Sequence, residues 1–293
     1  MYDAIILGGS YAGLSAGLPL ARARRRVLVI DAGLRRNRFA AASHGFLTQD
    51  GAPPDEIVAH GREQLMNYDT VDWLHTEIQH VERAEEGFRL LDRQGEAYQA
   101  RVLILATGVV DELPAIPGLA ERWGTRVFHC PYCHGYELQR GRIGVLAVSA
   151  ISMHQALMLP DWGRTTFLLN RAFEPSAEEL AQLQQRGVAL ERAPVVRLDG
   201  EPLEVILEEG RTLALDGLFV APRTRLSPLV SQLGCALEEG PMGAFIRTDP
   251  TQATSIPGLF ACGDVARGAG SVPLAVGDGA MAGTAAHRLL MFG

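Results

Sequence analysis

Cys130 and Cys133, two cysteines separated by two residues, are the side chains best suited to chemistry in this sequence. Histidines lie close to the pair on both sides, at His129 and His134. Two thiols at this spacing can close a small-ring disulfide and exchange it with another thiol. Cysteine and histidine together are also common zinc ligands. The cluster therefore indicates either redox chemistry or part of a metal site.

The zinc interpretation lacks ligands. A structural zinc site needs four of them, usually from two such pairs. The other cysteines, Cys235 and Cys262, are isolated in the sequence and are expected to be small buried hydrophobic residues. Ligands that all fall within residues 129–134 cannot easily surround one ion. The sequence thus favours a redox pair and predicts no metal site.

The composition indicates an ordinary globular protein with enough apolar residues for two domains. The chain has 293 residues, of which 47% are hydrophobic and 21% charged. Its net charge of −7 offers no basic surface for nucleic acid or for an anionic membrane. The N-terminus lacks the features of a signal peptide, and no apolar run reaches the roughly 18 residues that span a bilayer. We therefore expect a cytoplasmic protein, and in that reducing compartment a close cysteine pair is more plausibly catalytic or metal-binding than a structural disulfide.

Residues 2–31 have the pattern of an apolar strand, a glycine-rich turn, a helix of small residues and a second apolar strand. The turn approximates G-x-G-x-x-G and consists of Gly8, Gly9, Ser10, Tyr11, Ala12 and Gly13. Backbone N–H groups in such a turn bind a pyrophosphate, and the acid that ends the second strand, here Asp31, accepts a ribose hydroxyl. The pattern predicts dinucleotide binding, although a turn that needs glycine only for close packing would look similar.

A basic run follows this acid at residues 35–38. It leaves two interpretations open, because such a run is often a solvated surface loop. Alternatively, Asn37 and Arg38 are candidate contacts to the same cofactor.

Two later stretches have a related pattern. An apolar strand at residues 102–106 ends in Thr107-Gly108, and a strand near the C-terminus is followed by Gly263-Asp264 and a helix of small residues. Both resemble flavoproteins with two dinucleotide-binding domains, in which these elements belong to the FAD domain. The resemblance implies that Asp264 holds the ribityl or pyrophosphate part of FAD and that Gly279 starts a helix under the isoalloxazine ring. Asp264 could instead be a turn residue that only caps a helix.

The order of these motifs resembles the low-molecular-weight thioredoxin reductase family over essentially the whole chain. This resemblance implies an α/β fold of two Rossmann-like dinucleotide-binding domains, the second inserted into the first. Residues 1–112 and 247–293 would form the FAD-binding domain, and residues 113–246 an inserted NAD(P)H-type domain that carries the cysteine pair. The resemblance also implies that Cys133 faces the flavin and that Cys130 exchanges with the substrate. In addition, it implies a homodimer.

One position departs from these reductases, because His134 stands where they have an aspartate that donates a proton. Histidine can do the same acid–base work, since its ordinary pKa is near 6.5. It could also be merely packed beside the pair. The segment Cys-Pro-Tyr-Cys-His-Gly-Tyr-Glu resembles the gliotoxin- and holomycin-type oxidases, which oxidise dithiols in small natural products.

The nucleotide motif of the inserted domain is degenerate. Residues 147–152 contain no glycine, so Cβ atoms occupy the place where a pyrophosphate would approach the backbone. Asn170 and Arg171 stand where the family has paired arginines for the 2′-phosphate of NADPH, and Pro222-Arg223 replace a glycine in the returning strand. We therefore expect NAD(P)H to bind poorly or not at all.

The resemblance offers two other electron partners. Dithiol oxidases pass electrons from the substrate through the cysteines to FAD and then O2, whereas ferredoxin-linked reductases pass them from ferredoxin to a protein disulfide. The sequence thus predicts an FAD-dependent thiol–disulfide oxidoreductase that acts on a small dithiol or disulfide or on a thioredoxin-like protein. An NADPH-dependent thioredoxin reductase whose motif has drifted is one alternative. A flavin-bound redox sensor without turnover is another.

Overall fold

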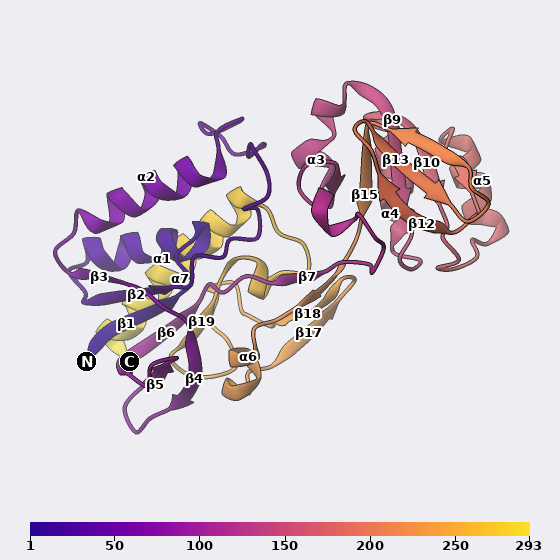
Figure 1. Ribbon diagram of the computed structural model, residues 1–293. Coiled ribbons are helices and arrows are strands. Elements are labelled where there is room, and N and C mark those ends of the chain that lie inside the picture. The colour runs from indigo at the N-terminus through magenta and orange to yellow at the C-terminus, as the bar shows by residue number, and fades with distance from the viewer. The chain divides into compact units, whose positions relative to one another are not determined.

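The computed structural model describes all 293 residues and divides into two compact units, each with its own core. Unit 1 consists of residues 1–38, 46–110 and 224–293, and unit 2 of residues 39–45 and 111–223. The chain therefore leaves unit 1 twice and returns to it twice. The longer excursion is the part of Figure 1 that carries β9 (Arg140–Leu146), β10 (Gly163–Leu168) and β15 (Gly217–Val220).

Unit 1 is built on a seven-stranded sheet with the order β3-β2-β1-β6-β5-β4, in which β19 also pairs with β6. Strands β4 and β5 are antiparallel to their neighbours and the other pairings are parallel. The strands are β1 Tyr2–Leu7, β2 Val27–Asp31, β3 Val71–His75, β4 Ile78–Arg83, β5 Phe88–Asp92, β6 Ala97–Leu105 and β19 Leu259–Ala261. A separate antiparallel hairpin consists of β17 Leu237–Gly240 and β18 Gly243–Ile246.

Both faces of the central strands are buried. Side chains alternate between the faces of a strand, so Ile5 and Leu7 belong to one apolar cluster and Ala4 and Ile6 to another. The first cluster includes residues of α6, and the second those of α1 and α7. The helices are α1 Tyr11–Arg22, α2 Pro54–Met66, α6 Pro228–Leu233 and α7 Val272–Phe292, with a 3-10 turn η4 Gly263–Ala266.

Helices α1 and α7 lie side by side (Figure 1) and approach closely through small residues. A Cβ atom added at Gly279 would collide with the carbonyl oxygen of Ala12, and one at Gly283 with that of Ala16. Gly279 was expected to start a helix, and this is wrong because α7 begins at Val272. The role of Gly279 in the fold is to admit the backbone of α1.

Unit 2 contains a five-stranded parallel sheet with the order β11-β10-β9-β15-β8. Its strands are β8 Val127–Phe128, β9 Arg140–Leu146, β10 Gly163–Leu168, β11 Ala189–Glu191 and β15 Gly217–Val220. An antiparallel sheet packs on one face and consists of β12 Val195–Asp199, β13 Leu203–Leu207 and β14 Thr212–Leu215. The other face is covered by α4 Ser152–Met158 and α5 Ala177–Gln185.

The remaining elements of this part of the chain are short. They are the helix α3 Pro131–His134 and the 3-10 turns η1 Ala120–Arg122, η2 Tyr136–Leu138 and η3 Leu159–Asp161. Two short strands at the crossings between the units, β7 Val110–Glu112 and β16 Arg223–Arg225, pair with each other. No helix of the molecule combines the length and the apolar character that crossing a membrane requires.

The chain returns to unit 1 at Thr224, earlier than the boundary at residue 247 predicted from the sequence. The reason is packing, because Leu229 and Leu233 of α6 are buried in the same cluster as Val81 of β4. Gln232 strengthens this contact, since its Oε1 accepts a hydrogen bond from the backbone N–H of Val81 at 2.9 Å. The assignment of FAD to unit 1 and of a nucleotide-type role to unit 2 remains a prediction.

Candidate redox site and nucleotide-binding turns

Cys130 and Cys133 form a disulfide at the start of α3, with their Cα atoms 5.3 Å apart. Pro131 occupies the first helical position, where its fixed φ and missing N–H suit the helix start. The turn is closed by two backbone hydrogen bonds, from Cys133 N–H to the Cys130 carbonyl at 3.2 Å and from Gly135 N–H to the Pro131 carbonyl at 2.7 Å. The spacing thus produces the redox pair that the sequence predicted.

His134 ends the same helix and is half-buried. Its ring stacks on Phe128, with the ring centroids 4.5 Å apart and the planes 23° apart. Burial lowers the pKa of His134 below its usual 6.5, and this effect outweighs that of the Glu137 carboxylate, which raises the pKa. A third influence is His44, which lowers the pKa further. The imidazole is therefore neutral at neutral pH and can accept a proton.

Exposed aromatic rings flank the disulfide. Tyr132 is 72% exposed and Tyr136 is 83% exposed. The ring of Tyr132 meets Trp162 edge-on at a centroid distance of 5.3 Å. The surface beside the cysteines therefore presents two aromatic rings.

The other residues considered as metal ligands have different surroundings. His129 directs Nδ1 toward the carbonyl oxygen of Val220 at 3.4 Å, and its own carbonyl accepts a hydrogen bond from Gln155 at 2.7 Å. Cys235 and Cys262 are buried, as expected for small hydrophobic residues, and burial raises the pKa of both thiols. No group of three or more His, Cys, Asp or Glu side chains is arranged to hold a metal ion.

The turn between β1 and α1 has the tight geometry that the glycine motif predicts. Gly8 has a φ of +102°, and a Cβ there would collide with the Ala106 carbonyl, while a Cβ at Gly13 would collide with the Gly8 carbonyl. The backbone N–H of Gly9 donates to Asp31 Oδ1 at 3.0 Å. Ser10 is the N-cap of α1, and its side chain accepts no hydrogen bond from the helix. The N–H groups of the first helical turn are thus left for a ligand.

The neighbouring strand end also has unused polar groups. Thr107 follows β6, which pairs with β1, and its Oγ1 is buried without a partner. Gly108 adopts a φ of +62°, and Gly263 adopts +75° and lies against Ala12, where an added Cβ would approach the Ala12 Cβ to 2.9 Å. These residues meet at the carboxyl ends of parallel strands, which is where dinucleotides bind in such sheets. Their arrangement therefore fits a bound FAD.

Asp264 is already paired in this structure. Arg36 donates from Nη1 to Asp264 Oδ2 at 2.8 Å, and both side chains are mostly buried, at 24% and 21% exposure. Asn37 donates to the hydroxyl of Tyr11 at 3.0 Å, which ties the basic run to the start of α1. Arg38 donates to the carbonyl of Arg35 at 2.6 Å. The run at residues 35–38 is therefore tied to η4 and to the start of α1, and is not a freely solvated loop.

The corresponding turn of unit 2, at residues 147–152, contains an internal hydrogen bond. The backbone N–H of Val148 donates to the hydroxyl of Ser152 at 3.1 Å, and Ser152 is fully buried. The side-chain oxygen of Asn170 accepts from Val195 N–H at 2.9 Å, and Arg171 forms an ion pair with Glu208 at 2.6 Å. The groups that stand at the positions of an NADPH site therefore have partners within the protein.

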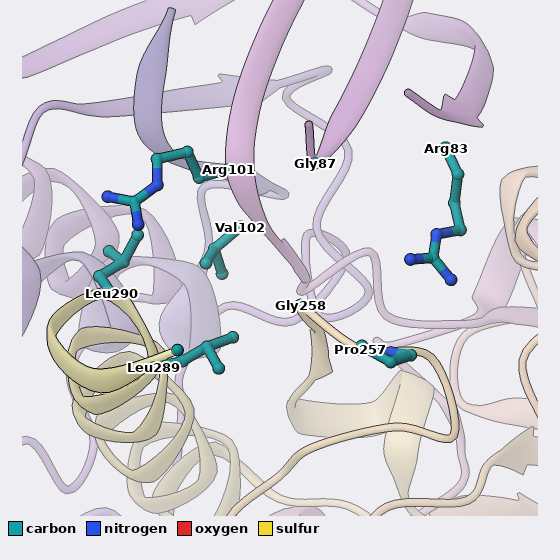
Figure 2. Close-up of a pocket in the computed structure, with 9 residues that line it drawn as sticks. Arg83, Gly87, Arg101, Val102, Pro257, Gly258, Leu289 and Leu290 are labelled. Carbon is teal, nitrogen blue, oxygen red and sulfur yellow. The ribbon is translucent and has the colours of Figure 1, made fainter. Parts of the chain in front are cut away.

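Cavities are found away from these residues. One in unit 1 has a volume of about 230 Å³, and Arg83 and Arg101 lie on opposite sides of it (Figure 2). Another in unit 2, of about 610 Å³, lies at the amino ends of β9 and β10. Neither is lined by a residue predicted to act in the site, and ligands of parallel sheets bind at the opposite end of the strands.

Comparisons with known proteins establish the family. Residues 2–279 match the family model for pyridine nucleotide-disulphide oxidoreductases. The chain belongs to this family. Among the relatives of this oxidoreductase, it is 34% identical over 304 residues to thioredoxin reductase tcpT of Claviceps purpurea (strain 20.1), covering 99% of this chain and 94% of the relative.

Solved structures agree over the same length. An oxidoreductase from Agrobacterium tumefaciens matches with a TM-score of 0.96 and 54% identity over 99% of both chains. The crystal structure of HlmI matches with a TM-score of 0.93 and 36% identity over 99% of this chain and 92% of that one. The predicted family and the thioredoxin reductase-like α/β fold are confirmed. Membership implies the binding of flavin and of a pyridine nucleotide.

Proposed function

We propose that this protein is an FAD-dependent thiol–disulfide oxidoreductase that takes electrons from a dithiol through the Cys130–Cys133 disulfide and uses NAD(P)H poorly or not at all. The observation that carries the proposal is the turn after β9, where Val148 N–H is bonded to the buried Ser152 hydroxyl. In a nucleotide site this N–H would be directed to a phosphate. If NAD(P)H does not bind there, the substrate dithiol is the remaining electron donor on the substrate side of the flavin.

The FAD would be held in unit 1. The open N–H groups of the first turn of α1 would bind the pyrophosphate and Asp31 the ribose, while Thr107 Oγ1 and Asp264 would contact the rest of the cofactor. Gly8, Gly108 and Gly263 would let the backbone approach it, and Asn37 and Arg38 would border it. When bound, the flavin supplies a two-electron acceptor next in line after the cysteines.

Exchange with a dithiol needs a base, and we assign this role to His134, which directly follows Cys133 in α3. A substrate thiol gives its proton to neutral His134, and the resulting thiolate attacks Cys130 Sγ. The Cys130–Cys133 bond breaks and Cys133 leaves as a thiolate. The second substrate thiol then attacks the mixed disulfide, which releases Cys130 and the oxidised substrate. The order of the two cysteines is carried over from the family.

The surface around the pair favours a small apolar dithiol or disulfide as substrate over a charged one. Tyr132 and Tyr136 expose their rings there, and aromatic rings bind apolar and aromatic ligands. The electrons would then pass from flavin to O2, or flow in the other direction from ferredoxin.

A second function is favoured by the names of the relatives, several of which are thioredoxin reductases. In that case NADPH would reduce the flavin, and the cysteine pair would reduce a thioredoxin-like protein. Unit 2 would then have to bind NADPH despite the closed turn and the Arg171–Glu208 ion pair.

An anaerobic titration of the purified flavoprotein with dithiothreitol, NADPH and reduced ferredoxin, side by side, distinguishes these functions. We expect the dithiol to bleach the flavin absorbance and stoichiometric NADPH to leave it unchanged over the same time. The Cys130→Ser/Cys133→Ser double variant is the control and should resist the dithiol. Prompt bleaching by NADPH would contradict the proposal, and a flavin reduced by none of the three would indicate a redox sensor.

A further inference from the structure

A short segment of the N-terminal half belongs to the unit that carries the disulfide. Residues 39–45 pack in unit 2 although the chain before and after them belongs to unit 1. Phe39 lies so close to Gly124 that a Cβ there would approach the Phe39 Cβ to 2.6 Å. At the other end of the segment, His44 Nε2 lies 3.4 Å from Glu137 Oε1. The segment therefore places His44 beside the carboxylate of Glu137, which follows α3 in the chain.

Glu137 links this histidine to the cysteine pair. It lies in η2, which follows α3 directly, and its side chain is 44% exposed, whereas that of His44 is 22% exposed. Glu137 and His44 are the two ionisable side chains whose charges act on His134. The Phe128 ring, which covers a face of the imidazole, is not ionisable. His129 also flanks the cysteines, but its Nδ1 is directed to the Val220 carbonyl.

We propose that His44 and Glu137 are a positioning pair for His134, and that the proton which His134 takes from an incoming thiol passes through this pair to solvent. The proposal rests on the exchange reaction given under the proposed function. It adds two residues to that reaction, which act through His134.

The exchange balances without any further oxidant. The dithiol R(SH)2 and the Cys130–Cys133 disulfide give a substrate disulfide, the Cys130 thiol, the Cys133 thiolate and one proton. One S–S bond breaks and one forms, and two electrons move from the substrate sulfurs to the cysteines. The proton of the second substrate thiol ends on Cys130, and the proton of the first is the one that His134 receives and must release.

Opposite charges explain why two residues are needed. The carboxylate of Glu137 stabilises protonated His134, so the proton can be accepted. His44 acts in the opposite direction and lowers the pKa of His134, so the proton is not retained. Because Glu137 and His44 both reach solvent, they offer the half-buried imidazole a way to exchange with water.

The test is the single-turnover reduction of the disulfide in the full-length holoprotein by excess dithiothreitol, quenched with N-ethylmaleimide and read by mass spectrometry. His44→Gln and Glu137→Gln should each slow the reduction by about tenfold at neutral pH, below the 10²–10⁴-fold effect of a direct general base. The low-pH limb of the rate profile should move to higher pH in His44→Gln and to lower pH in Glu137→Gln. Added imidazole should restore the rate of His44→Gln.

The matched control is His80→Gln. It removes another exposed histidine–carboxylate pair, His80–Glu82 at 3.6 Å, from a strand of unit 1. This variant should react like the wild type at every pH.

Two results would overturn the proposal alone: His44→Gln and Glu137→Gln variants that react like the wild type, or a uniform slowing with an unmoved pH limb and no imidazole rescue. The second result would mean that the pair only supports the fold. A wild-type disulfide that does not react with dithiothreitol would overturn the proposed function and this inference with it.

Discussion

His134 is the residue to which the proposed mechanism assigns proton transfer. Its ring stacks on Phe128, and burial keeps its pKa below 6.5. A neutral imidazole accepts protons from thiols, whereas the aspartate found at this position in the resembling reductases is described as a donor. The substitution of one residue type for another therefore suits dithiol oxidation.

Replacing His134 should slow thiol exchange and change its pH dependence. We expect a dithiol to reduce the Cys130–Cys133 disulfide of the His134→Asn variant about 100-fold more slowly than that of the wild type, because the substitution removes the proposed general base. Since the pKa of His134 is lowered, the neutral base persists below pH 6.5, and the wild-type rate should fall only at lower pH. Stopped-flow measurements from pH 5 to 8 check both points.

The informative companion is His134→Asp, which keeps an ionisable group. Aspartate has an ordinary pKa near 3.9, so this variant should recover part of the rate and move the low-pH limb further down. If His134→Asn keeps the wild-type rate and profile, the base lies elsewhere.

Among single residues, the sequence predicted those features whose geometry depends on the spacing of neighbouring residues. The cysteine pair and the Gly8–Gly13 turn are short motifs whose geometry follows from a few adjacent dihedral angles. Residue pairs that are distant in the sequence leave no local motif from which their contact could be predicted. Arg36 and Asp264 are 228 residues apart, and His44 reaches Glu137 only because residues 39–45 pack in unit 2.

Among the elements, the contact of α1 with α7 controls the shape of the proposed FAD site. The N-terminus of α1 is aimed by its packing on α7, where Ser15 Oγ donates to the Val276 carbonyl at 2.6 Å. Small residues at the interface let the two backbones approach. A change that separates the helices should therefore disturb the cofactor turn as well as the core.

Gly279→Ala should destabilise the protein by about 2 kcal/mol, because the new Cβ collides with the Ala12 carbonyl and forces the helices apart. Gly277→Ala, in the same helix, is the matched control, since nothing lies within 4 Å of its Cβ position. It should raise stability by about 0.5 kcal/mol through the higher helix propensity of alanine. Urea unfolding followed by circular dichroism measures both, and equal effects would contradict the packing argument.

Element boundaries followed the sequence where periodicity and turn residues agree. The strand–turn–helix–strand over residues 2–31 appears as β1, α1 and β2. The start of α7 was misplaced although the sequence carries a start signal there, with Ser271 at the N-cap and Pro273 in the first turn. The return to unit 1 at Thr224 depends on what α6 packs against, which local sequence does not determine.

The molecule as a whole contains four apolar clusters, two in unit 1 and two in unit 2, so we expect the two units to open locally and separately. Phe219 is fully buried in the core of unit 2, and Phe88 is almost fully buried in that of unit 1. Phe219→Ala should cost about 3–5 kcal/mol and increase hydrogen exchange in β9, β10 and β15. Phe88→Ala should increase exchange in β5 and β6 instead.

Peptide-resolved hydrogen exchange with mass spectrometry separates the two effects. The prediction fails if either variant raises exchange to the same extent in both sets of strands, because the units would then open together.

The assignment of residues to the two units also determines the order in which they can be completed during synthesis. Every element of unit 2 has been made once the ribosome passes residue 223, whereas unit 1 still lacks β19 and α7. Domains generally fold as units as they emerge, so the cysteine-bearing unit can form first. Until α7 has been made, the apolar side chains of β1 and β2 that belong to the same cluster as α7 are not covered by it. In a growing chain, the N-terminal strands are therefore the part most in need of protection by a chaperone.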